Sequence, residues 1–507
     1  MAAIEANLPE GITSLLDTDL YKLTMQCCIL KFFPDVSVTY SFTNRTPDKK
    51  LSRAAFKWLQ AQVDKLEDIR VSPEELDFLK KNCPYLNSQY LLFLSKFHLK
   101  PSTQLKLTFT AINDTSSDED LGDFRIDTEG LWLDTILYEI PLLALVSEAY
   151  FKFVDKDWTY EGQVDKAYQK GRKLLQEGCI FSEFGTRRRR DYHTQDLVLQ
   201  GLRRAADEGK TSGWEGKLSG TSNVHFAHKH ELLPVGTVAH EWFMGVAAIT
   251  NDYEHANEIA LEYWTATFGE GVLGVALTDT FGTPTFLKAF KKPIPNITTA
   301  IEGGSTTLAS AAATTDPTTQ SLASTEPPIH AGLDGANRPR RTYAEVFIGV
   351  RQDSGDPLDF VKMMREFYDY EGIKEKKTIV FSDSLNLELC FKYKAAAEAA
   401  GFQPTFGVGT FLTSKSSLKN LSEQTLTGTD DFIEKSTGNK SVPLNIVIKI
   451  ASASGRHAVK ISDNAGKNTG DKATVEEVKK RLGYTEKEWA GGDEKTRWGT
   501  AKQPAAA

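Results

Sequence analysis

Cysteine is scarce in this sequence, and long apolar runs are missing. Five cysteines stand among 507 residues, none in CxxC spacing, so neither a zinc site nor a disulfide framework can be read from them. No stretch of about 18 apolar residues occurs, and Glu5 and Glu10 stand where a signal peptide would carry basic residues. These absences predict a cytoplasmic or nucleocytoplasmic protein in a reducing compartment, with no membrane segment.

An excess of positive charge is also missing. Sixty Lys and Arg residues against 68 Asp and Glu residues give a formal net charge of −8, which argues against a broad surface for nucleic acid or an anionic membrane. No GxxxxGK[ST] and no HExxH motif occurs, so a P-loop enzyme is disfavoured and a zincin is excluded. With 40% apolar and 25% charged residues, the composition is that of a globular enzyme whose anion sites are local.

The first third of the sequence mixes helical and strand patterns. Residues 18–33 predict a helix, and the apolar patterns of residues 36–45 and 105–111 predict two strands. The apolar helical stretch 131–154 contains Pro141, which must kink one helix or separate two. We expect this stretch to bridge an N-terminal α/β domain, residues 1–150, and a second domain.

From Cys179 onward, short apolar runs end in polar residues and are followed by mostly helical sequence. This repeat predicts either a barrel or a doubly wound sheet, with residues 151–440 as the catalytic domain. The polar residues gather where the runs stop, which is where barrel enzymes carry their active sites. The seven runs are residues 179–185, 216–223, 234–240, 273–279, 346–353, 378–383 and 405–410.

Two other segments stand apart from this repeat. Residues 303–341 are rich in Thr, Ser, Ala and Pro and predict a disordered insertion, with a functional lid as the alternative. Residues 444–463 predict a hairpin around Ser454 and Gly455. We expect this C-terminal region, about residues 441–500, to complete the sheet of the N-terminal domain.

Two strand ends carry groups that suit anions. Gly407 and Gly409 would let backbone N–H groups approach a phosphate, and Thr410 adds a hydroxyl, although glycines at strand ends are often only turns. Four consecutive arginines, residues 187–190, cannot all face one way, so we expect some to be surface charges. Arg187 is our candidate for a phosphorylated ligand.

The segment RQDSGDP, residues 351–357, concentrates charge at another strand end. Arg351 suits a substrate carboxylate, and Asp353 suits sugar hydroxyls or Mg²⁺. Asp383 repeats the acidic theme after the next run. Asp356 is better explained as the N-cap of the helix that Pro357 starts.

Histidines occur in two further segments. His225, His228 and His230 lack a carboxylate or cysteine at ligand spacing, so we predict no metal site there. His240 ends an apolar run and precedes Glu241. At a barrel strand end it could be a general base or a phosphate acceptor, or simply a half-buried, hydrogen-bonded side chain.

Together these segments resemble the nicotinate phosphoribosyltransferase family. The motifs FSEFGTRRR, SGTSN, GTVAHEWFMG, ALTDTF, GVRQDSGDP, VFSD, FGVGT and PLNIVIKI stand in that family's order, between SLLDTDLYKLTMQ and KISDNAGKNTGDKA. The resemblance implies an irregular α/β barrel with an added N-terminal α/β domain that C-terminal strands complete. It also implies a homodimer with sites near the subunit interface, and the 303–341 insertion is the chief departure from the family.

The activity implied by the resemblance is synthesis of nicotinate mononucleotide from nicotinate and phosphoribosyl pyrophosphate (PRPP), releasing pyrophosphate. ATP is a co-substrate that phosphorylates His240, and Mg²⁺ accompanies PRPP and ATP. Two alternatives are a related enzyme for nicotinamide or quinolinate and a non-catalytic sensor of a phosphorylated metabolite. The order of the motifs favours nicotinate, and the retained His240 disfavours the sensor.

The resemblance also assigns roles to individual residues. The catalytic group is His240, Asp353 and Glu241. Nicotinate is expected to stack on Tyr21, with its carboxylate on Arg351 and further contacts from Ser219 and Thr221. Phosphate groups are expected at Arg187, Asn223, Asp279, Asp383, Gly407, Gly409 and Thr410, and Asp353 and Asp383 are the candidate Mg²⁺ ligands.

Overall fold

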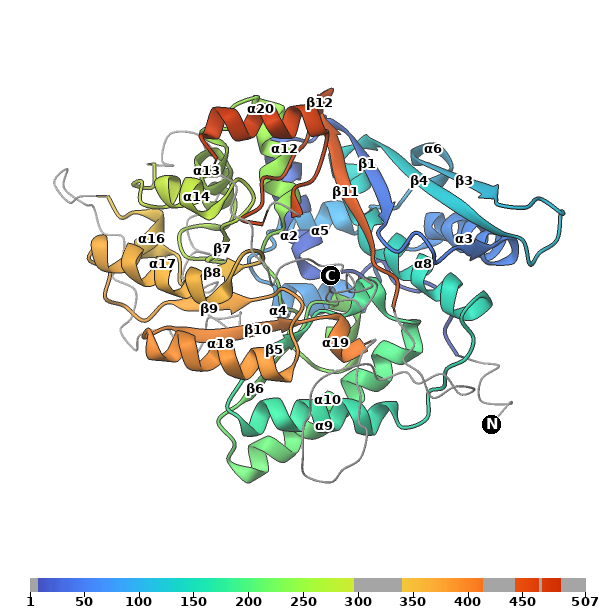
Figure 1. Cartoon of the computed structure of the whole chain (residues 1–507), viewed down its shortest axis with the longest axis horizontal. Helices are drawn as coiled ribbons and strands as arrows, with labels where there is room; N and C mark the ends of the chain where they lie inside the picture. The colour runs from blue at the N-terminus through green and yellow to red at the C-terminus, as the bar shows by residue number, and fades with distance from the viewer. Residues whose placement is uncertain (1–7, 296–339, 414–442, 465–466, 485–507) are drawn as a thin grey trace, which may run out of the picture.

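The computed structural model describes residues 8–295, 340–413, 443–464 and 467–484 (Figure 1). Within these ranges the chain forms two six-stranded sheets surrounded by helices. None of the helices in these ranges is both long and apolar enough to cross a bilayer. The predicted insertion lies outside them, apart from Arg340 and Arg341.

The first sheet is antiparallel and unites the two ends of the chain. Its strands follow the order β12-β11-β1-β4-β2, with β3 paired to β4. Val38 and Tyr40 of β1 are buried, and Tyr40 stands opposite Ile450 of β11. The strands are β1 (Ser37–Asn44), β2 (Leu51–Ser52), β3 (Leu105–Ala111), β4 (Leu121–Leu131), β11 (Ile446–Ala453) and β12 (Arg456–His457).

The predicted C-terminal hairpin is confirmed. Ser454 and Gly455 make its turn with φ values of +50° and +74°, a left-handed region that glycine adopts without strain. β11 pairs with β1 along its length, so residues from the end of the chain complete the N-terminal sheet. In Figure 1, β11 runs beside β1, and the chain continues through β12 to α20, which lies near α12.

Pro141 separates two helical pieces. The short helix α7 (Trp132–Thr135) and the 3-10 turn η2 (Ile136–Tyr138) end before α8 (Glu139–Phe153) begins, and Pro141 lies in the first turn of α8. The missing N–H costs nothing there, because the first N–H groups of a helix have no partner inside it. As predicted, α8 bridges the two parts, since it packs against β11 on one side and against η3 (Thr186–Arg188), which follows β5, on the other.

The second sheet is parallel, in the order β6-β5-β10-β9-β8-β7. Its strands are β5 (Ile180–Glu183), β6 (Lys217–Thr221), β7 (Val275–Leu277), β8 (Gly349–Gln352), β9 (Thr378–Phe381) and β10 (Gln403–Val408). Each lies in one of the predicted apolar runs, except that β10 begins two residues before its run. Helices connect them, as a parallel sheet requires.

Residues 234–240 were predicted as the seventh strand, but they do not form a strand. Pro234 has no N–H to donate, and only a single bridge joins it to Thr221. The segment nevertheless lies between the two outer strands: Val235 N donates to Thr221 O of β6 at 2.9 Å, and Thr237 Oγ1 donates to Val275 O of β7 at 3.3 Å. It therefore spans the gap between β6 and β7, which gives the irregular α/β barrel that was predicted.

The remaining elements surround these sheets. Asp356 caps α17 by accepting hydrogen bonds from the N–H groups of Leu358 and Asp359, as predicted. The domain boundaries near residues 150 and 440 stay predictions. The other elements are α2 (Leu20–Phe32), α3 (Arg53–Lys65), η1 (Leu66–Asp68), α4 (Pro73–Asn82), α5 (Ser88–Leu94), α6 (Pro101–Gln104), α9 (Gln163–Gln176), α10 (Tyr192–Ser212), α11 (Val224–Lys229), α12 (His240–Thr250), α13 (Ala256–Phe268), α14 (Thr283–Phe290), α16 (Tyr343–Val346), α17 (Pro357–Tyr370), α18 (Leu387–Ala399), α19 (Thr410–Thr413) and α20 (Lys472–Leu482).

Candidate active site

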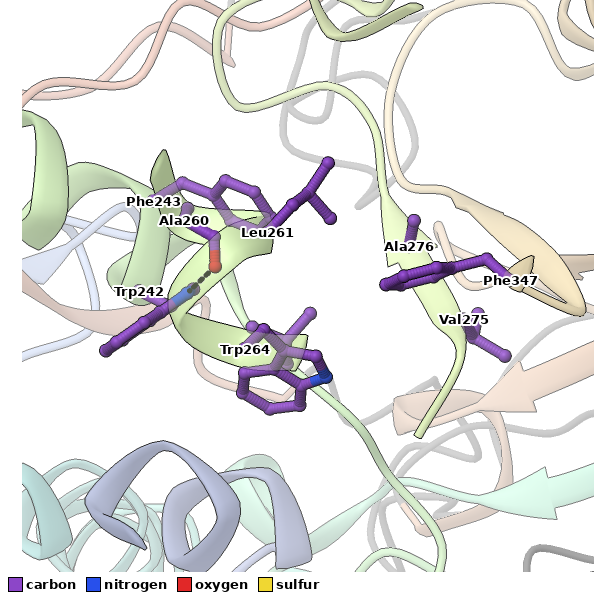
Figure 2. Close-up of a pocket in the computed structure, with 9 residues that line it drawn as sticks. Trp242, Phe243, Ala260, Leu261, Trp264, Val275, Ala276 and Phe347 are labelled. Atoms are coloured by element: carbon purple, nitrogen blue, oxygen red, sulfur yellow. Dashed lines mark hydrogen bonds between the residues drawn. The ribbon is translucent and has the colours of Figure 1, made fainter. Parts of the chain in front are cut away.

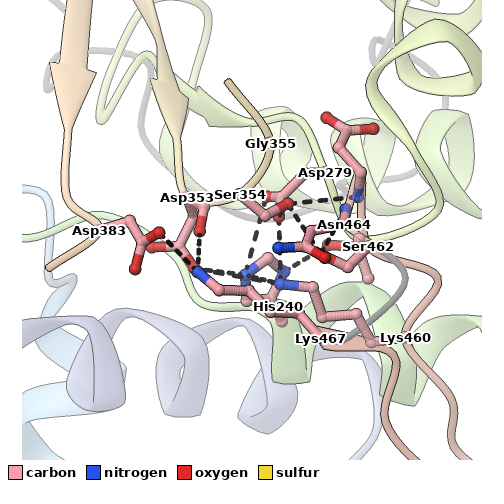
Figure 3. Close-up of polar contacts among 12 residues, drawn as sticks. His240, Asp279, Asp353, Ser354, Gly355, Asp383, Lys460, Ser462, Asn464 and Lys467 are labelled. Carbon is pink, nitrogen blue, oxygen red and sulfur yellow. Dashed lines mark hydrogen bonds and ion pairs between the residues drawn. The ribbon is translucent and has the colours of Figure 1, made fainter. Parts of the chain in front are cut away.

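His240 is the first residue of α12 and lies at the centre of a cluster of charged groups (Figure 3). Its Nδ1 is 3.0 Å from Thr280 Oγ1. Its Nε2 is 3.0 Å from Asp353 Oδ2 and 2.8 Å from Lys460 Nζ. Asp279 Oδ1 is 3.8 Å from the same nitrogen. The structure thus brings together His240, Asp279 and Asp353, three residues that the sequence placed at separate strand ends.

This environment keeps the imidazole neutral. Burial and the positive charge of Lys460 lower the pKa of His240 to about 4, although Asp279 and Asp353 act in the opposite direction. Burial would raise the pKa of Asp353, but Arg351, His240 and Lys460 outweigh it and hold that pKa well below its usual range. Near neutral pH the cluster therefore contains a neutral histidine and ionised aspartates.

Arg351 and Asp353 hold each other at the end of β8. Arg351 Nη2 donates to Asp353 Oδ1 at 2.8 Å, and its Nε donates to Ser382 Oγ at 2.9 Å. Ser382 Oγ is also 2.7 Å from Asp353 Oδ1. Among the described residues, Arg351 Nη1 has only a long contact, 3.4 Å, with the carbonyl of Val238. The Nη1 edge of this guanidinium is therefore suited to bind another anion.

Lysines from the C-terminal segment complete the cluster, and sequence reasoning missed them. Lys460 is buried and lies 3.1 Å from Asp279 Oδ2. Lys467 bonds Asp383 Oδ2 at 2.7 Å and the backbone oxygen of Asp353 at 3.1 Å. The available signal was the motif KISDNAGKNTGDKA, which holds both lysines and marks the C-terminal end of the family resemblance.

A third lysine of this region, Lys449 in β11, is affected by the same charges. Burial lowers its pKa to about 7, with further lowering from Lys460 and Arg45. The C-terminal region thus contributes several cationic groups to the barrel mouth as well as strands to the first sheet.

The predicted metal ligands are separated. Of the described residues, His240, Asp279 and Asp353 present ligand atoms within 4.8 Å of one another, whereas Asp383 is held by Lys467. Asp279 Oδ1 is buried without a hydrogen-bond partner among the described residues, which fits a cation. Oxygen ligands of this kind suit Mg²⁺, and Lys460 already brings one positive charge to the same place.

The predicted phosphate loop lies at the end of β10. A Cβ on Gly409 would come within 2.9 Å of the Phe184 carbonyl oxygen, so glycine permits a close approach of two backbones. A Cβ on Gly407 would be 3.4 Å from the Phe184 ring, which is ordinary contact. Thr410 starts α19, a helix of four residues. Packing therefore explains Gly409 but does not require glycine at position 407, and phosphate binding at this loop stays a prediction.

Tyr21 and Arg187 interact electrostatically at a second part of the barrel mouth, and the Arg187 side chain is 40% exposed. Burial and the charges of Asp19 and Glu139 raise the pKa of Tyr21 well above its usual range. Burial opposes the charge of Arg187, but Tyr21, Glu139, Asp19 and Asp353 outweigh it and raise its pKa. Charged groups from both parts of the proposed site, including Asp19 and Asp353, therefore act on the guanidinium of Arg187.

The other three arginines of the run are not surface charges, which corrects our prediction. Arg189 makes two hydrogen bonds to Asp17, of 2.8 and 2.7 Å, and both side chains are fully buried. Arg188 donates to Asn445 Oδ1 at 2.7 Å, and the guanidinium of Arg190 lies 3.9 Å from the centre of the Phe151 ring. A buried guanidinium needs such partners, and sequence alone does not reveal them.

Ser219, Thr221 and Asn223 are buried at the end of β6. Thr221 Oγ1 donates to Glu183 at 2.6 Å, and Asn223 Nδ2 donates to Asp17 at 2.7 Å while its Oδ1 caps α11. Within the part of the chain that the structure describes, Ser219 Oγ has no hydrogen-bond partner. The contacts of Thr221 and Asn223 are those of residues that hold a loop, so their substrate contacts stay predictions.

Glu241 points away from His240 into a buried cluster. Its Oε1 accepts hydrogen bonds from Tyr40 at 2.6 Å and from Trp132 Nε1 at 2.9 Å, and its Oε2 pairs with Lys22. Both carboxylate oxygens are engaged, which favours a positioning role over the predicted catalytic one.

An apolar cavity of about 10 Å³ lies behind the His240 helix (Figure 2). Trp242 and Phe243 line it from α12, opposite Trp264 of α13 and Phe347. Trp242 Nε1 donates to the carbonyl of Ala260 at 3.1 Å. This packing fixes α12, and hence His240, against the barrel; the cavity is too small and too dry for a substrate.

Comparisons with known proteins agree with this geometry. Residues 16–147 match the nicotinate phosphoribosyltransferase (NAPRTase) N-terminal domain, and residues 179–301 and 330–486 match the nicotinate phosphoribosyltransferase (NAPRTase) family. The chain belongs to the nicotinate phosphoribosyltransferase family. The stretch between the two later matches falls on the predicted insertion.

Individual family members are similar over nearly the whole chain. A probable nicotinate phosphoribosyltransferase of Schizosaccharomyces pombe is 42% identical, with 93% of this chain and 98% of that protein covered. The nicotinate phosphoribosyltransferase of Saccharomyces cerevisiae is also 42% identical, with 96% and 99% covered. A crystal structure of a putative nicotinate phosphoribosyltransferase from S. cerevisiae superposes with a TM-score of 0.78 at 42% identity and covers 94% of this chain and all of that one.

Proposed function

We propose that this protein synthesises nicotinate mononucleotide from nicotinate and PRPP, with release of pyrophosphate, in NAD biosynthesis, and that ATP drives the reaction by phosphorylating His240. The observation that carries the proposal is the neutral His240 between Thr280, Asp353 and Lys460 at the mouth of a family barrel. A non-catalytic sensor would not need a histidine that its charged neighbours and burial keep neutral.

In the proposed phosphorylation, Nδ1–H of His240 donates to Thr280 and leaves the lone pair on Nε2. That lone pair forms a bond to the γ-phosphorus of ATP while the bond to the bridging oxygen breaks, and ADP departs with the electron pair. Lys460 lies beside Nε2 and stabilises the negative charge of the transferred phosphoryl group. Hydrolysis of the phosphohistidine returns neutral His240 and phosphate.

In the proposed transfer, the C1–O bond of PRPP breaks and the pyridine nitrogen of nicotinate forms the new bond to C1. The transition state has oxocarbenium character, so stabilising the departing pyrophosphate is the main requirement. Asp353 and Asp279 would hold Mg²⁺, which neutralises phosphate charge when bound. Asp383, Gly407, Gly409, Thr410 and Asn223 are the remaining proposed contacts to PRPP.

Nicotinate is proposed to lie between the two parts of the mouth. The Tyr21 ring is proposed to stack on the flat ligand, and the Nη1 edge of the Arg351 guanidinium is proposed to bind its carboxylate. Ser219 and Thr221 are proposed as further contacts, and the buried unpartnered hydroxyl of Ser219 supports that choice. Arg187 is proposed to meet phosphate beside Tyr21.

We also propose a homodimer in the cytoplasm or in both cytoplasm and nucleus. The proposed dimer has its sites near the subunit interface, as the family resemblance implies.

The deciding experiment is product formation from nicotinate, nicotinamide and quinolinate, each with PRPP and with or without ATP. We expect product from nicotinate, increased by ATP, and acid-labile, base-stable label on the protein from γ-labelled ATP. In His240→Asn the label and the ATP stimulation should vanish while some PRPP-dependent transfer remains. ATP stimulation that survives in this variant would exclude His240 as the acceptor, and product from another pyridine would overturn the substrate.

A further inference from the structure

A buried ion network joins the residue after His240 to the residue after Tyr21. The Lys22 side chain is fully buried, and its Nζ lies 2.5 Å from Glu139 Oε2 and also pairs with Glu241. Lys22 follows Tyr21 in α2, and Glu241 follows His240 in α12. The Lys22 ammonium group therefore links α2, which carries Tyr21, to α12, which carries His240.

The carboxylates on the two sides of Lys22 extend the network in different directions. Glu139 Oε1 is 3.9 Å from Arg187 Nη1, at the part of the mouth where Tyr21 lies. Glu241 is fixed by Tyr40 of β1 and by Trp132 of α7. The chain of contacts runs from Arg187 through Glu139 and Lys22 to the start of the His240 helix.

Such a network is a strong positional constraint. Each buried charge has a partner, so a shift of one helix would separate opposite charges in a place with little water. The attraction between Lys22 and its two carboxylates outweighs burial and keeps the pKa of Lys22 raised. A displacement at α12 would therefore strain the pairs that Lys22 makes with Glu241 and Glu139.

We propose that Lys22 is a positioning residue that couples the phosphorylation state of His240 to nicotinate binding at Tyr21 and Arg187. This inference rests on the proposed function and deepens it. When His240 gains a phosphoryl group, the start of α12 carries added negative charge and bulk, and Glu241 is the adjacent residue. The Lys22 bridge then biases the position of Arg187 and of the Tyr21 ring, so that ATP hydrolysis and nicotinate capture are linked.

The test compares a charge-balanced double variant, Lys22→Met with Glu241→Gln, with the unchanged protein. The double substitution removes one cation and one anion, and Glu139 keeps Arg187 as its cationic neighbour at 3.9 Å. We expect the ATP hydrolysed per nicotinate mononucleotide formed, and the KM for nicotinate, each to rise by at least about five-fold, the low end of coupling between sites. Labelling of His240 by ATP should persist.

Two further variants make the result decisive. Tyr40→Phe removes one hydrogen bond to Glu241 with little change of shape, and it should shift the same ratio in the same direction by less. Leu174→Ala, in the buried face of α9, should lower the melting temperature without changing the ratio.

A ratio and KM in the double variant and in Tyr40→Phe that match those of Leu174→Ala would overturn the inference, whether or not the double variant is destabilised. Failure of the unchanged protein to form product from nicotinate would instead refute the proposed function.

Discussion

His240 owes its chemistry to its neighbours more than to its own identity. A solvent-exposed histidine has a pKa of about 6.5 and is mixed in charge near neutrality. Here burial and Lys460 lower the pKa to about 4. Since only the neutral ring has a free lone pair, the cluster keeps the proposed acceptor reactive at cellular pH.

This pKa makes the pH dependence of phosphorylation testable. Protonation begins only as the pH approaches 4, so labelling of the unchanged protein by γ-labelled ATP should be similar at pH 5.5 and 7.5. Removing the positive charge in Lys460→Met should raise the pKa of His240, so labelling of that variant should fall at pH 5.5 relative to pH 7.5. Equal ratios in both proteins would contradict the role given to Lys460.

Arg351 is expected to contribute to substrate choice. In Arg351→Ala the KM for nicotinate should rise by an amount equivalent to about 2 to 5 kcal/mol, as expected when a desolvated guanidinium partner is lost, and the KM for PRPP should change less. Arg351→Lys is the matched control, since it keeps the charge but loses the planar fork. Equal losses for both substrates would show that Arg351 serves mainly to hold Asp353.

At the scale of elements, α12 is held unusually close to the N-terminal part. A Cβ on Gly245 would lie 2.4 Å from Trp132 Cη2, and the Trp132 ring also stacks on Trp242 at 5.9 Å. Trp132 in turn donates to Glu241. Glycine at this position therefore allows the helix to approach the side chain that fixes its first turn.

Gly245→Ala should consequently disturb both stability and catalysis. Glycine to alanine usually favours a helix, but the added methyl group must displace Trp132, and overpacking of this kind costs about 1 to 3 kcal/mol. We expect a lower melting temperature and weaker ATP stimulation. Gly201→Ala, a helical glycine of α10 whose Cβ would also meet close backbone, separates the two effects, since it should lower stability alone. An unchanged melting temperature for Gly245→Ala would mean that Trp132 can move without cost.

At the scale of the whole molecule, the start of α2, which carries Tyr21, packs against the barrel of the same chain, where Leu20 N donates to Ser222 O at 2.8 Å. The family resemblance favours a Tyr21 ring that crosses into the site of a partner subunit, and this stays a prediction. If Tyr21 crosses, Tyr21→Ala and Asp353→Ala, each inactive, should regain part of their activity when they are mixed and refolded together, because each heterodimer holds one site free of both substitutions. No recovery in confirmed heterodimers would place Tyr21 in the site of its own chain.

The sequence determined the elements and most members of the site. Periodicity in β1 and the Ser454–Gly455 turn identified the completed first sheet, and polar residues at strand ends identified His240, Arg351 and Asp353. These signals are local, because strand alternation, turn conformation and capping each depend on a few neighbouring residues.

Only the tertiary structure decided which charges are buried and what they meet. Lys460 and Lys467 reach the barrel mouth because β11 completes a distant sheet, and Arg189 is buried because Asp17 lies opposite it. Residues 234–240 have the sequence pattern of a strand. In the gap between β6 and β7 they form only a single bridge, between Pro234 and Thr221, because proline has no N–H to donate. Each of these outcomes depends on a partner far away in sequence, since a buried charge or an unpaired backbone is tolerated only where the fold supplies its complement.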